Sequence, residues 1–189
     1  MPPTLLCTLV ADHPLILLTG TSAAGKTTVG RLLADALPAS AFVEGDAVRT
    51  MVRGGRVDMT PEPTPEALRQ LALRHRQTAL LADSFHDAGF ATVVEDVVLG
   101  RHLVEFVRSL RARPLHVVVL VPDEDTVRRR EAERDKIAYD DVWTPAALNA
   151  VVHRDTPRIG LWLDSSSHTA AQTVEQVLKR LPEALVEHL

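Results

Sequence analysis

The stretch Gly20-Thr21-Ser22-Ala23-Ala24-Gly25-Lys26-Thr27 decides the fold of this 189-residue chain. It matches the pattern G-x-x-x-x-G-K-[ST], in which half of the positions are fixed. An aliphatic run at residues 14–19 precedes it, and a helical pattern at residues 28–37 follows it. Because the pattern requires strand, loop and helix in this order, we expect the start of an α/β fold rather than an ordinary glycine-rich turn.

The fixed residues of this loop suit phosphate binding. Glycines at its two ends allow backbone angles and a close approach that a Cβ would obstruct, so successive N–H groups can turn toward phosphate oxygens. The helix that follows adds its unpaired N-terminal donors and the positive end of its dipole. Lys26 supplies a positive charge for the β- and γ-phosphates, and the hydroxyl of Thr27 is placed to bind Mg²⁺. The sequence therefore predicts a nucleoside triphosphate site made by Gly20, Thr21, Ser22, Ala23, Ala24, Gly25, Lys26, Thr27 and Thr28.

Length and composition narrow the class of protein. The length suits one domain, residues 1–189, with room for a sizeable core. Lys and Arg total 21 and Asp and Glu 25, a net charge of -4 that gives no general attraction to nucleic acid. The single cysteine, Cys7, excludes an internal disulfide and a thiolate zinc site. No apolar run approaches the length of a bilayer span and no secretory leader is visible, so we expect a cytoplasmic protein without a membrane or nucleic-acid partner.

Further strands are expected at residues 41–44, 90–94, 115–121 and 159–163, with helical patterns between them. Five strands that alternate with helices predict a three-layer α/β/α sandwich built on a parallel sheet.

Acidic residues stand at the ends of two of these strands. Asp46 follows the strand at 41–44, and ligands of open parallel sheets gather outside the carboxyl ends of the strands, which makes it a candidate catalytic and substrate-binding residue. It is equally suited to cap the helix expected at 47–52, and the two roles are compatible. Glu95 and Asp96 close the strand at 90–94. Either of them is a candidate to hold Mg²⁺ through water, and alternatively one of them contacts the acceptor. The remaining alternative is that both are solvated acids at the end of a strand.

A glycine- and proline-rich excursion at residues 53–65 separates the second strand from a long helix at 64–88. Its position makes the segment from about 47 to 88 a candidate cover for the substrate. Arg49 is a candidate substrate contact and forms, with Arg53 and Arg56, the basic cluster nearest the predicted site. One or two of the polar residues on the long helix are also candidates for the acceptor pocket: Arg69, Arg74, His75, Arg76 and Gln77.

A highly charged helix is predicted from Asp123 to Lys136. Arg130 and Arg134 lie four residues apart and therefore on one face, where they repel each other. A triphosphate between them would relieve that repulsion. The alternative is a salt-bridged helix that faces solvent.

Four features together resemble the P-loop small-molecule kinases: the glycine-rich loop, the turn Glu44-Gly45-Asp46, the turn Glu95-Asp96-Val97 and the helix Arg130-Glu131-Ala132-Glu133-Arg134. Within that group the chain most resembles the chloramphenicol phosphotransferase-like family, and less closely the shikimate and gluconate kinases, over about residues 15–181. The resemblance implies ATP- and Mg²⁺-dependent phosphorylation of a small-molecule hydroxyl, strand order 2-3-1-4-5, and a helical lid at about residues 128–145.

The resemblance also implies roles for single residues. Asp46 matches the general base, Asp96 matches the acid after the third strand, and Arg130 and Arg134 match the lid arginines that hold the triphosphate. Glu95 departs from the Asp-Asp pair of other members, which leaves the division of metal and acceptor contacts between the two acids open.

The resemblance does not identify the acceptor molecule. An antibiotic and a metabolite are both candidates. Two alternatives stay open: a nucleotide or polynucleotide 5′-end kinase, and an ATP-binding regulatory module with slow hydrolysis.

Overall fold

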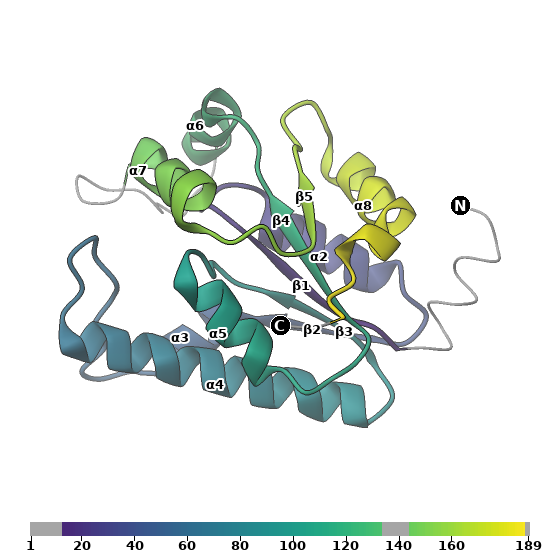
Figure 1. The fold of residues 1–189 in the computed structure, drawn as a ribbon, viewed down its shortest axis with the longest axis horizontal. Helices are drawn as coiled ribbons and strands as arrows, with labels where there is room; N and C mark the ends of the chain where they lie inside the picture. The colour runs from purple at the N-terminus through teal and green to yellow at the C-terminus, as the bar shows by residue number, and fades with distance from the viewer. Residues whose placement is uncertain (1–12, 134–143, 188–189) are drawn as a thin grey trace.

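The computed structural model describes residues 13–133 and 144–187, which form one parallel sheet covered by helices on both faces (Figure 1). The sheet order is β2-β3-β1-β4-β5, and every neighbouring pair is parallel. The expected strand order and the α/β/α class are therefore confirmed. The strands are β1 (Leu15–Gly20), β2 (Ser40–Glu44), β3 (Ala91–Glu95), β4 (Leu115–Leu120) and β5 (Leu161–Leu163).

Four of the α-helices in the described residues begin at a residue whose side chain caps the helix, whereas α2, α3 and α5 begin without such a bond. Thr64, Asp123, Thr144 and Thr169 each accept a hydrogen bond from the first turn of the helix that follows. The helices are α2 (Lys26–Asp35), α3 (Gly45–Thr50), α4 (Pro65–Asp87), α5 (Arg101–Ser109), α6 (Glu124–Ala132), α7 (Pro145–Ala150) and α8 (Ala170–Lys179), with a π-helical turn η1 (Val151–Asp155) and a 3-10 turn η2 (Leu181–Ala184).

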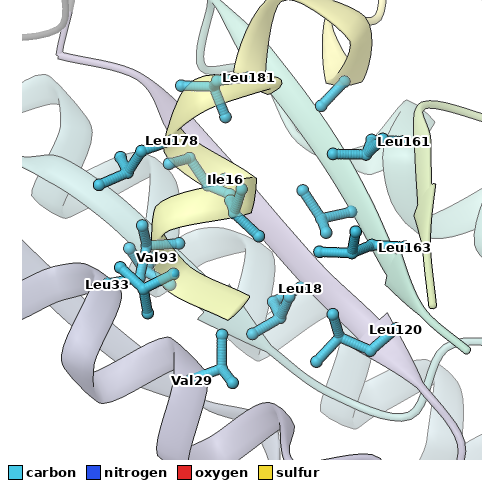
Figure 2. Close-up of a cluster of buried hydrophobic side chains, with 14 of the residues drawn as sticks. Ile16, Leu18, Val29, Leu33, Val93, Leu120, Leu161, Leu163, Leu178 and Leu181 are labelled. Carbon is cyan, nitrogen blue, oxygen red and sulfur yellow. The ribbon is translucent and has the colours of Figure 1, made fainter. Parts of the chain in front are cut away.

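Side chains of the central strand alternate between two cores. Ile16 and Leu18 pack toward α2 and α8 in the cluster that Figure 2 shows. Leu15 and Leu17 face the opposite side and pack with residues of α4 and α5. All four are fully buried, which explains why β1 reads as a continuous aliphatic run rather than an alternating one.

The register of the strands sets the position of the site. Glu95 at the end of β3 lies opposite Glu44 at the end of β2 and opposite Leu18 of β1. The loops that follow these three strands therefore leave the sheet side by side at its carboxyl edge, where open α/β sheets bind ligands.

The charged helix α6 is shorter than the helix predicted from Asp123 to Lys136. An ion pair joins Glu124 and Arg128 on its surface, but α6 ends at Ala132. Arg134 and most of the expected lid lie outside the described residues. In the parts that are described, no helix is both long and apolar enough to cross a bilayer.

Candidate active site

The loop between β1 and α2 has the backbone of an anion cradle. Gly20 has a φ of 142°, and a Cβ there would overlap the carbonyl of Leu120 on the neighbouring strand. Ala23 and Gly25 also have positive φ, at 57° and 93°. Gly25 stands at the N-cap of α2, where no side chain satisfies the first N–H groups of the helix. These groups suit the oxygens of a bound phosphate.

Lys26 is held inside this loop. Its Nζ donates to the carbonyl of Thr21 at 2.8 Å, and the residue is 7% exposed. Burial lowers the pKa of Lys26, and the nearby carboxylates of Glu95 and Asp96 oppose that effect. The ammonium group thus lies among acids at the floor of the loop.

Thr27 and Glu95 form a pair of oxygen donors beside the lysine. The Thr27 hydroxyl donates to Glu95 Oε1 at 3.1 Å, whereas Glu95 Oε2 is buried without a hydrogen-bond partner. Burial raises the pKa of Glu95, and the neighbouring Asp96 carboxylate adds to this, so a cation beside Glu95 would relieve both effects.

This donor set fits Mg²⁺, which prefers hard oxygen ligands and uses one or two carboxylates with substrate phosphates. Within the described residues no cluster of three or more acidic, histidine or cysteine side chains can hold a metal. A cation at this position therefore depends on phosphate and water oxygens for its remaining ligands.

Asp96 points to a different partner. Arg74 of α4 donates from Nε to Asp96 Oδ2 at 2.8 Å and from a second nitrogen to Oδ1, and the backbone N–H of Val97 donates to Oδ1 at 2.6 Å. Asp96 is 1% exposed. The Asp96 carboxylate occupies space that a side chain at position 45 would fill, and Gly45 leaves that space open. The structure thus separates the two adjacent acids.

Asp46 lies in the first turn of α3, between two arginines. Its Oδ1 is 3.1 Å from Arg49 Nε and 3.6 Å from an Arg74 nitrogen. Glu44 occupies the N-cap position of this helix, and no side-chain capping bond is made there. Helix capping by Asp46 is therefore wrong, because the helix begins at Gly45, two residues earlier than its pattern suggested.

Arg130 connects the loop to the turn between β5 and α8. Its guanidinium donates to the carbonyls of Ala24 at 3.1 Å, Ser165 at 2.9 Å and His168 at 3.4 Å. Burial lowers the pKa of Arg130. Arg130 therefore lies against the cradle, and its contact with a triphosphate stays a prediction.

These side chains line one cleft of about 1260 Å³. Thr21 of the phosphate loop is buried and does not line the cleft. From the predicted site, the cleft brings together Ser22, Ala23, Ala24, Gly25, Lys26, Thr27, Thr28, Asp46, Arg49, Glu95, Asp96 and Arg130.

Sequence reasoning did not single out Arg74, Ser165 or His168, whose polar side chains belong to the cleft. Arg74 was only one of several polar residues on its helix, and nothing in the pattern distinguished it from Arg69 or Arg76. Ser165 and His168 line the cleft from the turn before α8, and each has a buried side-chain atom without a hydrogen-bond partner. Their position after the carboxyl end of the last strand was the sequence feature that could have indicated a place in the site.

A parallel sheet of this order, with a G-x-x-x-x-G-K-T loop opening into a cleft at its carboxyl edge, defines the P-loop kinase fold. The sequence profile described as "AAA domain" matches residues 15–157, and the chain belongs to that family. A search of curated proteins finds no significant match.

Solved structures of two kinases and of a resistance protein share the fold. A sugar kinase from Janibacter sp. HTCC2649 is 22% identical with a TM-score of 0.65, covering 90% of this chain and 95% of its own. A gluconokinase from Sinorhizobium meliloti 1021 is 19% identical with a TM-score of 0.60, covering 90% and 93%. The tunicamycin resistance protein of Deinococcus radiodurans is 20% identical with a TM-score of 0.60, covering 93% and 99%. The P-loop kinase fold is confirmed, whereas the closer resemblance to chloramphenicol phosphotransferase-like proteins stays a prediction.

Proposed function

We propose that this protein is an ATP- and Mg²⁺-dependent phosphotransferase that moves the γ-phosphoryl group to a hydroxyl of a small molecule. One observation carries the proposal: the phosphate cradle with Lys26 and the arginine-held carboxylate of Asp46 line the same cleft. The sugar kinase and gluconokinase among the similar structures support it by analogy.

At the donor end, the chain provides positive charge and N–H donors. Lys26 and the start of α2 neutralise phosphate oxygens, and Arg130 holds the cradle against the turn that follows β5. Thr27 and Glu95 would hold Mg²⁺, which when bound neutralises charge on the transferring group. Glu95 suits this role better than Asp96 because one of its oxygens is unpartnered.

At the acceptor end, Asp46 receives the proton of the acceptor hydroxyl. The acceptor oxygen forms a bond to the γ-phosphorus, the bond from that phosphorus to the bridging oxygen of ATP breaks, and ADP leaves. Arg49 and Arg74 fix the direction of the Asp46 carboxylate. Asp96 holds the guanidinium of Arg74 in place and therefore influences the Asp46 carboxylate indirectly, through Arg74. Most of the acceleration then comes from positioning and charge neutralisation.

The charges near the acceptor end argue against a polynucleotide 5′-end kinase. Two members of the basic cluster expected there, Arg49 and Arg56, both contact Asp58. Their positive charge is therefore offset where a nucleic-acid backbone would need it.

The function is tested with a panel of acceptors and mass detection of phosphorylated products. The panel holds aminoglycosides, phenicols, macrolides, nucleosides, sugars, polyols and a labelled oligonucleotide. We expect a small-molecule hydroxyl compound to accelerate ATP consumption and to gain one phosphoryl group. Phosphorylation of the oligonucleotide alone would favour the 5′-end kinase, and ATP consumption that no acceptor accelerates would favour a regulatory module.

A further inference from the structure

One part of the cleft, on the side of Asp46 away from the phosphate loop, is lined by charged side chains that form ion pairs with one another. We call it the acceptor end; its charged residues are Asp46, Arg49, Arg56, Asp58, Arg74 and Asp96. The numbers of arginines and aspartates in this set are equal, so its formal charge is zero. Each arginine contacts at least one of the aspartates.

The pairing at the outer wall is made by Asp58. Arg49 NH1 lies 2.6 Å from Asp58 Oδ1, and Arg56 Nε lies 3.5 Å from Asp58 Oδ2. Arg49 also reaches Asp46 through its Nε. Two of the three guanidiniums are thus engaged by an aspartate of the loop between α3 and α4.

The third guanidinium, Arg74, cannot leave its partner without cost. The Asp96 side chain is fully buried and receives two bonds from Arg74. Taking that arginine away would leave a buried carboxylate unpaired, which is strongly destabilising. An incoming anion would have to compete with this partner.

Apolar side chains alternate with these charges around the acceptor end. Val48 is buried against the cleft, whereas Met51 is 69% exposed. The apolar lining on this side includes Val48, Met51, Val52, Val57 and Leu71. Such surface favours an apolar ligand body with a few polar groups.

Recognition of a carboxylate or phosphate ester normally needs a guanidinium that is available for bidentate bonds. Among the described residues of the acceptor end, every arginine is already paired with an aspartate of the protein, and Arg74 contacts both oxygens of Asp96. We propose that the acceptor is an uncharged hydroxyl compound with an apolar body. This substrate class rests on the proposed phosphotransfer function and specifies it further.

The test uses compounds that differ by one feature. Shikimate with its methyl ester and pantothenate with pantothenol differ by a negative charge, and methyl with octyl glucoside differ by apolar length. We expect kcat/KM for each neutral member to exceed that of its anionic counterpart by about tenfold or more, and octyl glucoside to exceed methyl glucoside. Equal or better use of the anionic members would overturn the inference and leave the proposed function intact.

Asp58→Asn tests the cause directly. The change removes the carboxylate that engages Arg49 and Arg56, so the neutral preference should shrink at least about threefold, mainly through better use of the anionic member. Asp87→Asn is the matched control, because Asp87 also pairs with an exposed arginine, Arg111, but stands at the far end of α4. An unchanged preference in Asp58→Asn would overturn the inference.

A binding measurement tests the substrate class separately from the proposed phosphotransfer activity. If no member of the pairs is phosphorylated, the proposed function fails for these compounds, and saturation-transfer NMR on protein loaded with Mg²⁺ and a non-hydrolysable ATP analogue decides the substrate class. Signals from the neutral members only would support it. Signals from the anionic members, or from no member, would overturn it.

Discussion

At the scale of residues, the adjacent acids Glu95 and Asp96 have different partners because the backbone there is extended. Successive side chains of a strand point to opposite faces of the sheet. Val93 packs in the core beside α2 and Val94 in the core beside α4. Continuing this alternation directs Glu95 toward Thr27 and Asp96 toward Arg74.

Arg74 is the residue whose loss should cost most stability in the site. Arg74→Gln leaves the buried Asp96 carboxylate without its cation, and we expect the free energy of unfolding to fall by about 3 to 5 kcal/mol. Denaturant unfolding measures this. Arg69→Gln on the same helix removes an exposed pair with Glu66 and should leave stability unchanged. Equal effects of the two substitutions would show that the Asp96 pair has no special role.

His75 should make stability depend on pH. Burial lowers its pKa to about 4, with Asp96 and Glu105 opposing and Arg74 and His102 adding to the shift. The unfolded chain takes up the proton near pH 6.5 and the folded protein only near pH 4, so stability falls as the pH drops through this window, by up to about 3 kcal/mol.

Unfolding of the wild type and His75→Phe at about pH 7 and about pH 4.5 measures this contribution. The variant should lose less stability between the two values. An identical loss in both proteins would rule out His75 as the source.

At the scale of elements, local patterns were sufficient to predict the five strands and the phosphate loop, whereas the strand order came from the resemblance to P-loop kinases. The sequence was not sufficient for the ion pair between Arg74 and Asp96, since that contact joins α4 to the residue that follows β3, and the two residues are 22 positions apart in the sequence. The alternation of Val93, Val94 and Glu95 along the strand implies that Glu95 and Asp96 point to opposite faces of the sheet. Only the packing of α2 and α4 shows which face each acid occupies.

The junction of β2 and α3 is as constrained as the phosphate loop. A Cβ at Gly45 would overlap the carboxylate of Asp96, whereas nothing lies near a Cβ at Gly54. We expect Gly45→Ala to displace Asp96 and, through Arg74, to misalign Asp46, lowering kcat by about tenfold or more. Steady-state kinetics with the acceptor found by the panel measures this, and Gly54→Ala should retain wild-type kcat. Wild-type turnover in Gly45→Ala would contradict this arrangement.

At the scale of the whole molecule, one sheet edge carries two unlike half-sites. The donor half comes from the loop after β1, with Arg130 of α6 against it, and has unsatisfied helix N–H groups and an orphaned acid oxygen. The acceptor half comes from α3, α4 and the loop between them, and its charges are paired within the protein. Asp46 stands between the halves, and the proposed function depends on it.

The most direct measurement is therefore the kinetics of Asp46→Asn with the acceptor that the panel identifies, alongside binding of a non-hydrolysable ATP analogue. Lys26→Ala serves as the comparison, since it should lose the analogue as well as transfer. For Asp46→Asn we predict analogue affinity within about twofold of the wild type and kcat lower by about 100-fold or more. Wild-type turnover in Asp46→Asn would contradict the account.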